Sequence, residues 1–265
     1  MGKIDLDSTT SKHKGLKGFF EIALRKFKNL MHAILMIPIY LFAASSIGFS
    51  LIAGITLFRW VETLVTNESH LLQNLFYGMA LAVGYFLYGL SMLFIIPFYN
   101  FVVRGYLKEW RGPYYSIESI KWFLHNGLTY LVRFTFLEFV TPSPLNILFY
   151  QLMGMKIGRG VVINSSWISD PSLIEIGEKS TIGGSVTLVA HYGQGGMLII
   201  SPVKIGKGCT IGLKATIMGG VTIGDGAKIL PHSILLPKTH VPAGETWGGV
   251  PAAPIKITKS IKTTA

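Results

Sequence analysis

From residue 199 to residue 241 an aliphatic side chain returns at every sixth position. The residues of this run are Ile199, Ile205, Ile211, Ile217, Ile223, Ile229, Leu235 and Val241. Helices repeat near every 3.6 residues and strands every 2, so a sustained period of six is typical of neither. It is typical of a solenoid of short β-rungs, in which each aliphatic side chain points into a narrow core. Glycine often follows the aliphatic residue, where the chain must turn a corner.

The same period continues upstream with two irregularities. The upstream aliphatic positions are Ile157, Ile163, Ile176, Ile182 and Leu188. One extra residue falls near Ser169 and Asp170, and the interval from Leu188 to Ile199 is eleven, which predicts five inserted residues within 189–197. A regular solenoid that carries an irregular, glycine-rich loop usually has a use for it. The alternative is a change of length at one corner that has no function.

The first half of the chain is strongly apolar. Residues 29–58 and 69–103 contain no Asp, Glu, Lys or Arg, and each run exceeds the roughly 20 residues that cross a bilayer core. The first run is too long for a signal peptide and lacks a cleavage site after a short apolar core. We therefore predict two transmembrane helices within 29–111, with buried helices of a soluble protein as the alternative.

Charge placement predicts the orientation of these helices. Residues 1–28 carry seven Lys or Arg against three acidic residues, and Arg104, Lys108 and Arg111 follow the second run. By the positive-inside rule both ends face the cytoplasm, which predicts a multi-pass protein of the inner membrane. The hydrophobic pattern of residues 112–153 predicts amphipathic helices, which we expect to lie on the inner membrane face. Aromatic residues cluster near the predicted membrane interface, namely Trp110, Tyr114, Tyr115 and Trp122.

The composition agrees with this division. Half of the residues are hydrophobic and only 14% are charged, unlike a soluble domain of this length. The net charge of +11 is explained by basic residues that meet anionic lipid. Nucleic acid is not expected as a partner, because the lysines of the repeat are spread along it and are not stacked with aromatic residues.

One histidine is placed for chemistry. His191 heads the predicted insertion, on an otherwise regular surface, whereas His232 and His240 occupy ordinary outward or corner positions. A neutral imidazole can take a proton from a hydroxyl or amine while that group attacks an acyl carbon. The single cysteine, Cys209, occupies a small inward position and is expected to pack as a core residue.

Residues 157–257 resemble the hexapeptide-repeat acyltransferases in three features. These are the repeat itself, the histidine-headed loop Ala190-His191-Tyr192-Gly193, and the closing stretch 248–256, in which Val250 replaces the usual asparagine. The resemblance implies a left-handed parallel β-helix, a homotrimer with active sites between neighbouring subunits, and an acyl-CoA donor. It implies neither a bound cofactor nor a metal, since acyl-CoA, with acetyl-CoA among the candidates, is a co-substrate.

The resemblance also assigns site residues by position. His191 would be the general base, and Gly219 and Gly220 would offer backbone N–H groups to the pantetheine arm of the donor. The residues that fall where the family meets the nucleotide end of CoA are Lys238, Trp247 and Lys256. A cation suits the CoA phosphates, and the alternative for each lysine is a solvated surface charge.

A second resemblance covers more of the chain. Residues 149–158 and 169–177, with the apolar helices upstream, resemble the terminal membrane domains of nonribosomal peptide synthetases of the poly-lysine-synthetase type. This similarity implies a carrier-protein thioester as donor and an amine as acceptor. Those domains often place acidic residues after the loop histidine, where this chain has Tyr192-Gly193-Gln194. An acid that orients the imidazole must then come from elsewhere, for instance a neighbouring subunit, or a backbone carbonyl takes its place.

The predicted organisation is a basic cytoplasmic leader (1–28), two transmembrane helices (29–111), amphipathic interfacial helices (112–153), a β-helical acyltransferase domain (154–257) and a basic tail (258–265). The expected function is transfer of an acyl group, acetyl first, from a CoA thioester to a hydroxyl or amine. One alternative is aminoacyl or peptidyl transfer from a carrier-protein thioester, and another is a non-catalytic trimeric membrane scaffold. A zinc enzyme is a weaker alternative, because His191, His232 and His240 are separated by whole coils.

Overall fold

The structure, a computed structural model, describes residues 10–11, 13–103 and 106–255. The chain divides into two compact units. The helical unit contains residues up to 107 and residues 113–140, and the solenoid unit contains Lys108–Gly112 and the chain from Thr141 onward. Lys256 and the predicted basic tail lie outside the described residues.

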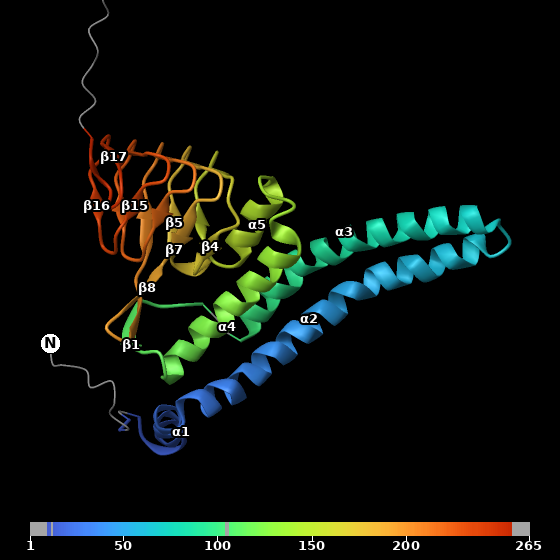
Figure 1. Cartoon of the computed structure of the whole chain (residues 1–265), viewed down its shortest axis with the longest axis horizontal. Helices are drawn as coiled ribbons and strands as arrows, with labels where there is room; N and C mark the ends of the chain where they lie inside the picture. Colours follow the sequence, from blue (N-terminus) through green and yellow to red (C-terminus); the bar gives the residue numbers. More distant parts are fainter. Residues whose placement is uncertain (1–9, 12, 104–105, 256–265) are drawn as a thin grey trace, which may run out of the picture. The chain divides into compact units, whose positions relative to one another are not determined.

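The helical unit is built on two long apolar helices (Figure 1). Its elements are α1 (Gly15–Lys26), α2 (Lys28–Val65), α3 (His70–Val102), α4 (Ile117–Val132) and the π-helical turn η1 (Arg133–Leu137). By length and composition α2 and α3 could each cross a membrane. The α2 helix continues through Arg59 and Glu62, so these two charged residues lie on the helix and not in the connection between α2 and α3.

The two long helices approach closely at a pair of glycines. A Cβ atom on Gly54 of α2 would lie 3.2 Å from the Cα atom of Gly84 on α3. Small residues at such a crossing let two helix backbones come together, as they do in membrane helix pairs. Gly54 and Gly84 thus have a packing reason in the two apolar runs.

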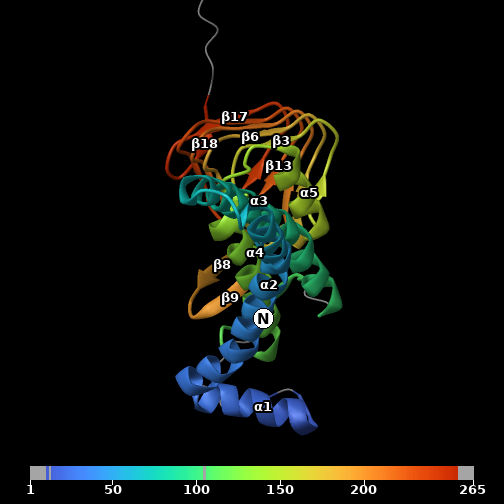
Figure 2. The same ribbon diagram turned by 90° about the vertical axis from the view of Figure 1, so that its right-hand side faces the viewer.

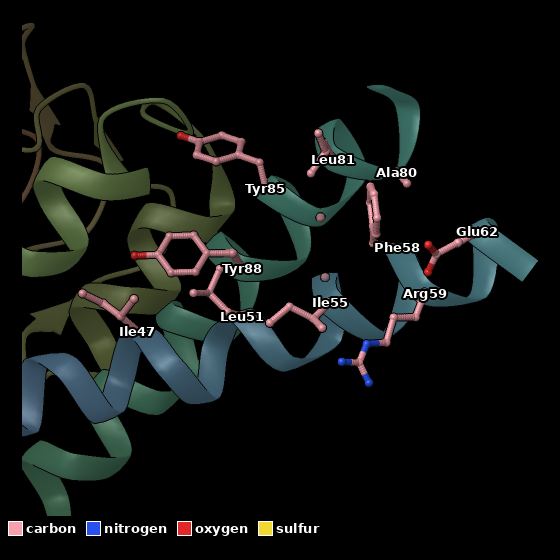
Figure 3. Close-up of a pocket in the computed structure, with 12 residues that line it drawn as sticks. Ile47, Leu51, Ile55, Phe58, Arg59, Glu62, Ala80, Leu81, Tyr85 and Tyr88 are labelled. Carbon is pink, nitrogen blue, oxygen red and sulfur yellow. The ribbon is translucent and has the colours of Figure 1, made fainter. Parts of the chain in front are cut away.

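A cavity of about 710 Å³ opens between α2 and α3. Figure 3 shows that its lining is aliphatic and aromatic, with Arg59 and Glu62 at one end. Tyr85 is part of this lining, and its hydroxyl donates to the carbonyl of Thr135 at 3.0 Å. Such a lining suits hydrocarbon.

The solenoid unit begins with a short helix and continues as β-rungs. Its elements are α5 (Pro144–Leu152), β1 (Trp110–Pro113), β2 (Lys156–Ile157), β3 (Val162–Ile163), β4 (Ile168–Ser169), η2 (Pro171–Leu173), β5 (Ile174–Ile176), β6 (Thr181–Ile182), β7 (Thr187–Val189), β8 (His191–Gln194), β9 (Met197–Ile200), β10 (Val203–Ile205), β11 (Thr210–Ile211), β12 (Thr216–Ile217), β13 (Thr222–Ile223), β14 (Lys228–Ile229), β15 (Ile234–Leu235), β16 (His240–Val241), β17 (Thr246–Gly248) and β18 (Ala253–Pro254).

The rungs form three sheets around a narrow core (Figures 1 and 2). Face 1 has the order β16-β13-β10-β5-β2, face 2 has β18-β17-β14-β11-β6-β3, and face 3 has β15-β12-β7-β4. All neighbours in these faces are parallel except β18, which pairs antiparallel with β17. The chain visits the faces in turn, so the predicted parallel β-helix is confirmed.

The six-residue period has a direct structural basis. Ile205 lies opposite Ile176 in the preceding coil and Ile223 in the next, and these side chains are buried. At the corners the coils stack closely: a Cβ atom on Gly212 would lie 2.4 Å from the nitrogen of Pro231. Burial raises the pKa of the Cys209 thiol, in keeping with its role as a core residue.

The insertion differs from the prediction. Ile199 does not occupy a rung, because it lies in β9, opposite Tyr192 in an antiparallel β8–β9 hairpin. Along the solenoid Leu188 is followed by Ile205, so the insertion is longer than the predicted five residues. The hairpin strand β9 buries Leu198, Ile199 and Ile200, and one of these three residues, Ile199, keeps the six-residue count by coincidence. The segment that holds β1 adds a third strand beside β9.

Candidate active site

His191 is the first residue of β8 and lies where face 3 turns into face 1. Its side chain is 19% exposed, whereas that of Asp170 is fully buried. The Nδ1 atom of His191 lies 2.5 Å from the Oδ2 atom of Asp170. The same oxygen accepts the backbone N–H of Ala190 at 3.0 Å. The acid that orients the imidazole is therefore supplied by this chain, and the hypotheses of a neighbouring subunit or a backbone carbonyl are not needed.

Asp170 comes from the preceding coil, between β4 and the turn η2. Its φ of 59° is in the left-handed region, which Asp tolerates better than most residues. A carboxylate only accepts hydrogen bonds, so Nδ1 of His191 carries the proton and Nε2 is the nitrogen that can take one up. A buried carboxylate also favours the imidazolium that forms when Nε2 is protonated. The pair has the arrangement of a general base and its orienting acid.

Sequence reasoning missed Asp170, although a signal was present. The residue lies 21 positions before His191, which is one coil of three rungs plus the extra residues of η2. Both irregularities of the repeat, near Asp170 and after Leu188, therefore fall on the same corner of the solenoid. Two irregularities about one coil apart would have pointed to this pairing.

The structure brings Gly219, Gly220 and Lys238 to the same corner as His191. The corner between faces 3 and 1 stacks these residues in four successive coils, and we call it the histidine ridge; its members are Asp170, His191, Gly219, Gly220 and Lys238. A Cβ atom on Gly219 would lie 2.9 Å from the backbone nitrogen of His191. A Cβ atom on Gly220 would lie 2.9 Å from Cγ of Lys238.

The amide of Gly220 already has a partner inside the protein. It donates to the carbonyl of Ser201 at 3.1 Å, and the amide of Lys238 donates to the carbonyl of Gly219 at 3.1 Å. The donor-binding role of the Gly220 amide stays a prediction, and in this structure the amide is hydrogen-bonded within the protein. Because Gly219 and Gly220 have no side chains, the coils can stack closely against His191, and space remains along the ridge.

Glu109 also lies beside the histidine ridge, which the sequence did not predict. Its Oε1 atom is 3.2 Å from Oγ of Ser201, and the amide of Ser201 donates to the carbonyl of Ala190 at 2.8 Å. Glu109 belongs to Lys108–Gly112, the part of the connection between α3 and α4 that joins the solenoid unit. The exposed carboxylate of Glu109 thus lies beside the ridge, and the ridge itself carries the exposed ammonium of Lys238.

The structure does not bring Trp247 to the ridge. Trp247 lies in β17 on face 2, opposite Ile229, and its Nε1 atom donates to Glu245 at 2.7 Å. The three histidines of the zinc hypothesis are also apart, since His232 is at another corner and His240 contacts Thr222 on face 1. Among residues 10–11, 13–103 and 106–255, no group of three or more His, Cys, Asp or Glu is arranged to hold a metal ion.

Replacing Gly219 with alanine should lower the turnover number by about 10- to 100-fold, because the new Cβ would push on the backbone of His191. The matched control is Gly183→Ala, whose Cβ would lie 2.8 Å from the carbonyl of Ile211 at a different corner. Both variants should have a lower melting temperature. When both are assayed in the folded state, only Gly219→Ala should have a lower turnover number. Equal turnover in the two variants would contradict the close coupling of Gly219 to His191.

Comparison with known proteins finds a matching family model for the repeat and a relative of similar sequence. A family model described as the hexapeptide repeat of succinyl-transferase matches residues 202–229. YvoF, a candidate acetyltransferase of Bacillus subtilis (strain 168), is 32% identical over 154 residues, which are 54% of this chain and 88% of YvoF.

A second relative is much larger than this chain. The delta-poly-L-ornithine synthetase of Acinetobacter baumannii (strain AB307-0294) is 21% identical over 180 residues, which are 66% of this chain and only 13% of the synthetase. Among solved structures, serine acetyltransferase of Neisseria gonorrhoeae aligns with 95% of this chain and 82% of its own, at 20% identity and a TM-score of 0.39.

Proposed function

The chain belongs to the hexapeptide-repeat acyltransferase family, and we propose that it is a membrane-anchored acyltransferase. It moves an acyl group, with acetyl the first candidate, from a CoA thioester to a hydroxyl or amine acceptor. The observation that carries the proposal is the 2.5 Å contact between His191 and the buried Asp170, because this contact prepares an imidazole to act as a base.

In the proposed reaction Nε2 of His191 removes the proton of the acceptor while its oxygen or nitrogen attacks the thioester carbonyl carbon. The tetrahedral intermediate then collapses, the carbon–sulfur bond breaks, and the leaving thiolate takes the proton from the imidazolium to give free CoA. Asp170 stabilises the imidazolium between these steps. The reaction needs no covalent enzyme intermediate, and fixed orientation of the two substrates supplies the rest of the acceleration.

The donor would lie along the histidine ridge. The ammonium of Lys238 is exposed and suits the phosphates of CoA, while Gly219 and Gly220 leave space beside the reacting carbonyl. Trp247 is on another face, so its predicted role in donor binding requires a neighbouring subunit. The homotrimer follows from the family resemblance, and exposed apolar residues of the solenoid are suited to contacts between its subunits; they include Trp167, Leu213, Leu230 and Leu236.

The membrane part of the proposal rests on α2 and α3. They contain 38 and 33 residues, more than the roughly 20 that a bilayer core requires, and many of their apolar side chains are exposed. The cavity between them suits lipid chains. With both ends in the cytoplasm, the acyltransferase would work at the inner face of the inner membrane, on an acceptor made or used there.

The match to the poly-ornithine synthetase supports a second candidate, aminoacyl or peptidyl transfer from a carrier-protein thioester to an amine. The alignment spans 180 residues, more than the predicted domain 154–257 contains, so it includes part of the chain outside that domain. The carboxylate of Glu109 beside the ridge is suited to a cationic amine acceptor. The chemistry at His191 would be the same in both candidates.

Titration calorimetry with detergent-purified protein separates these candidates. We expect acetyl-CoA and free CoA to bind saturably, and Lys238→Ala to raise the dissociation constant by about tenfold through loss of a charge-assisted hydrogen bond. The matched control is Lys204→Ala, which removes an exposed lysine of face 1. Binding of a carrier-protein thioester without binding of any CoA species would favour the second candidate, and binding of neither would favour the scaffold.

A further inference from the structure

We propose that α1 is an interfacial helix that docks on a bilayer surface carrying anionic lipid. The inference rests on the proposed membrane location of α2 and α3, and it adds a second, lipid-selective contact for the chain. Three observations carry it: the apolar outer face of α1, the inward position of its one acidic residue, and its direction relative to α2.

The apolar residues of α1 gather on the side that faces away from the helical unit. Leu16, Phe19 and Phe20 are 76%, 69% and 45% exposed, and Phe27, directly after the helix, is 52% exposed. Their spacing of three, four and seven places them on one face of a helix. On the opposite side Gly18, Glu21 and Leu24 are buried. These large side chains remain exposed even though Phe19 and Phe20 contact each other edge to face and the ammonium of Lys26 lies over the ring of Phe27.

The charges of α1 are divided between the same two sides. Glu21 is buried and paired with Arg25 at 2.7 Å, and it accepts a hydrogen bond from Ser11. Burial alone would raise the pKa of Glu21, but the bonds from Ser11 and Arg25 outweigh it and hold the pKa below its usual value. The only acidic residue of the helix is thus neutralised on the inner side. The exposed charges of this region are the lysines Lys14, Lys17, Lys26 and Lys28.

The direction of α1 fits a position in the membrane plane. Figure 2 shows α1 lying across the direction of α2, from which it is separated by the turn at Phe27. A helix that crosses the axis of a membrane-spanning helix runs along the membrane surface. Its aromatic face can then enter the boundary between headgroups and acyl chains, while lysines on both edges reach the headgroups. Lysines at this depth favour anionic over zwitterionic lipid.

The test uses the full chain in vesicles of phosphatidylcholine, with and without phosphatidylglycerol. An environment-sensitive fluorophore is attached at Phe19→Cys in a Cys209→Ala background, and its contact with acyl chains is read from quenching by brominated phosphatidylcholine. We expect strong quenching in the anionic vesicles and weak quenching in pure phosphatidylcholine. A label at Lys204→Cys on the solenoid is the control for non-specific quenching.

Charge variants test the lipid selectivity. Changing Lys14, Lys17 and Lys26 to glutamine should lower the ratio of docked to undocked α1 by about fivefold for each lysine removed. The matched control changes Lys204, Lys207 and Lys228 to glutamine, which removes the same charge from the solenoid and should leave the ratio unchanged.

Three results would overturn the inference. One is the absence of quenching at position 19 in both kinds of vesicle. Another is quenching that does not change with phosphatidylglycerol content or with the lysine substitutions. The third is self-quenching that grows with protein density, which would mean that a second copy covers the aromatic face. Flotation distinguishes these from a failure of the membrane anchor, because a chain without transmembrane helices would not remain with urea-washed vesicles.

Discussion

Replacing His191 with alanine should lower the rate of acyl transfer by roughly 100- to 10,000-fold, because the variant has no group to take the acceptor proton. The measurement follows release of free CoA thiol from acetyl-CoA in the presence of a panel of alcohols and amines. Donor binding, measured by calorimetry, should remain within about twofold of the wild type, because general-base help acts in the transition state and not on the bound donor.

The matched control for this variant is His240→Ala. His240 is exposed on face 1 and contacts Thr222, not Asp170, so its loss should leave turnover unchanged. An active His191→Ala variant would contradict the proposed mechanism. A variant that loses transfer in the assay but keeps the cellular role of the protein would favour the scaffold.

Changing Asp170 to asparagine should lower the turnover number by about 100-fold or more, with little change in the KM for the donor. The amide oxygen of asparagine can still accept a hydrogen bond from Nδ1–H of His191, but it carries no charge to offset the imidazolium. The amide can also turn its NH₂ group toward Nδ1 and stabilise the wrong tautomer. Steady-state kinetics with acetyl-CoA and the best acceptor of the panel measure both constants.

Glu109→Gln is the control for Asp170→Asn. It also removes a carboxylate beside the histidine ridge, but that carboxylate contacts Ser201 and not His191. Its effect should therefore appear in the KM for a cationic acceptor, not in the turnover number. Wild-type turnover in Asp170→Asn, with an unchanged melting temperature, would exclude the aspartate from the reaction.

The sequence predicts the solenoid well because each rung repeats one physical requirement. From Ile205 to Val241 every sixth side chain must fill the same narrow core, and the structure buries each of them. Ile199 shows the limit of the method. Its burial comes from a hairpin and not from a rung, and a count of hydrophobic positions does not distinguish these two environments.

The site could be predicted only in part. His191 is found because an insertion interrupts a regular repeat, whereas Asp170 is found only when the coils are stacked. The extra residue near Asp170 marks the place of η2 in the sequence, but the left-handed φ of 59° that positions the carboxylate has no pattern of its own. Glu109 could not be found in this way, because its contact with Ser201 joins residues 92 positions apart outside any repeat.

The strand β1 has a consequence for how the solenoid unit can be isolated. A fragment that starts at Thr141 would keep every coil, His191 and Asp170, yet it would lack Lys108–Gly112. The edge of β9 that β1 covers would then be open, and an open edge pairs readily with strands of other chains. We therefore expect a fragment that starts at Thr141 to aggregate more readily than one that also carries the β1 segment through a linker.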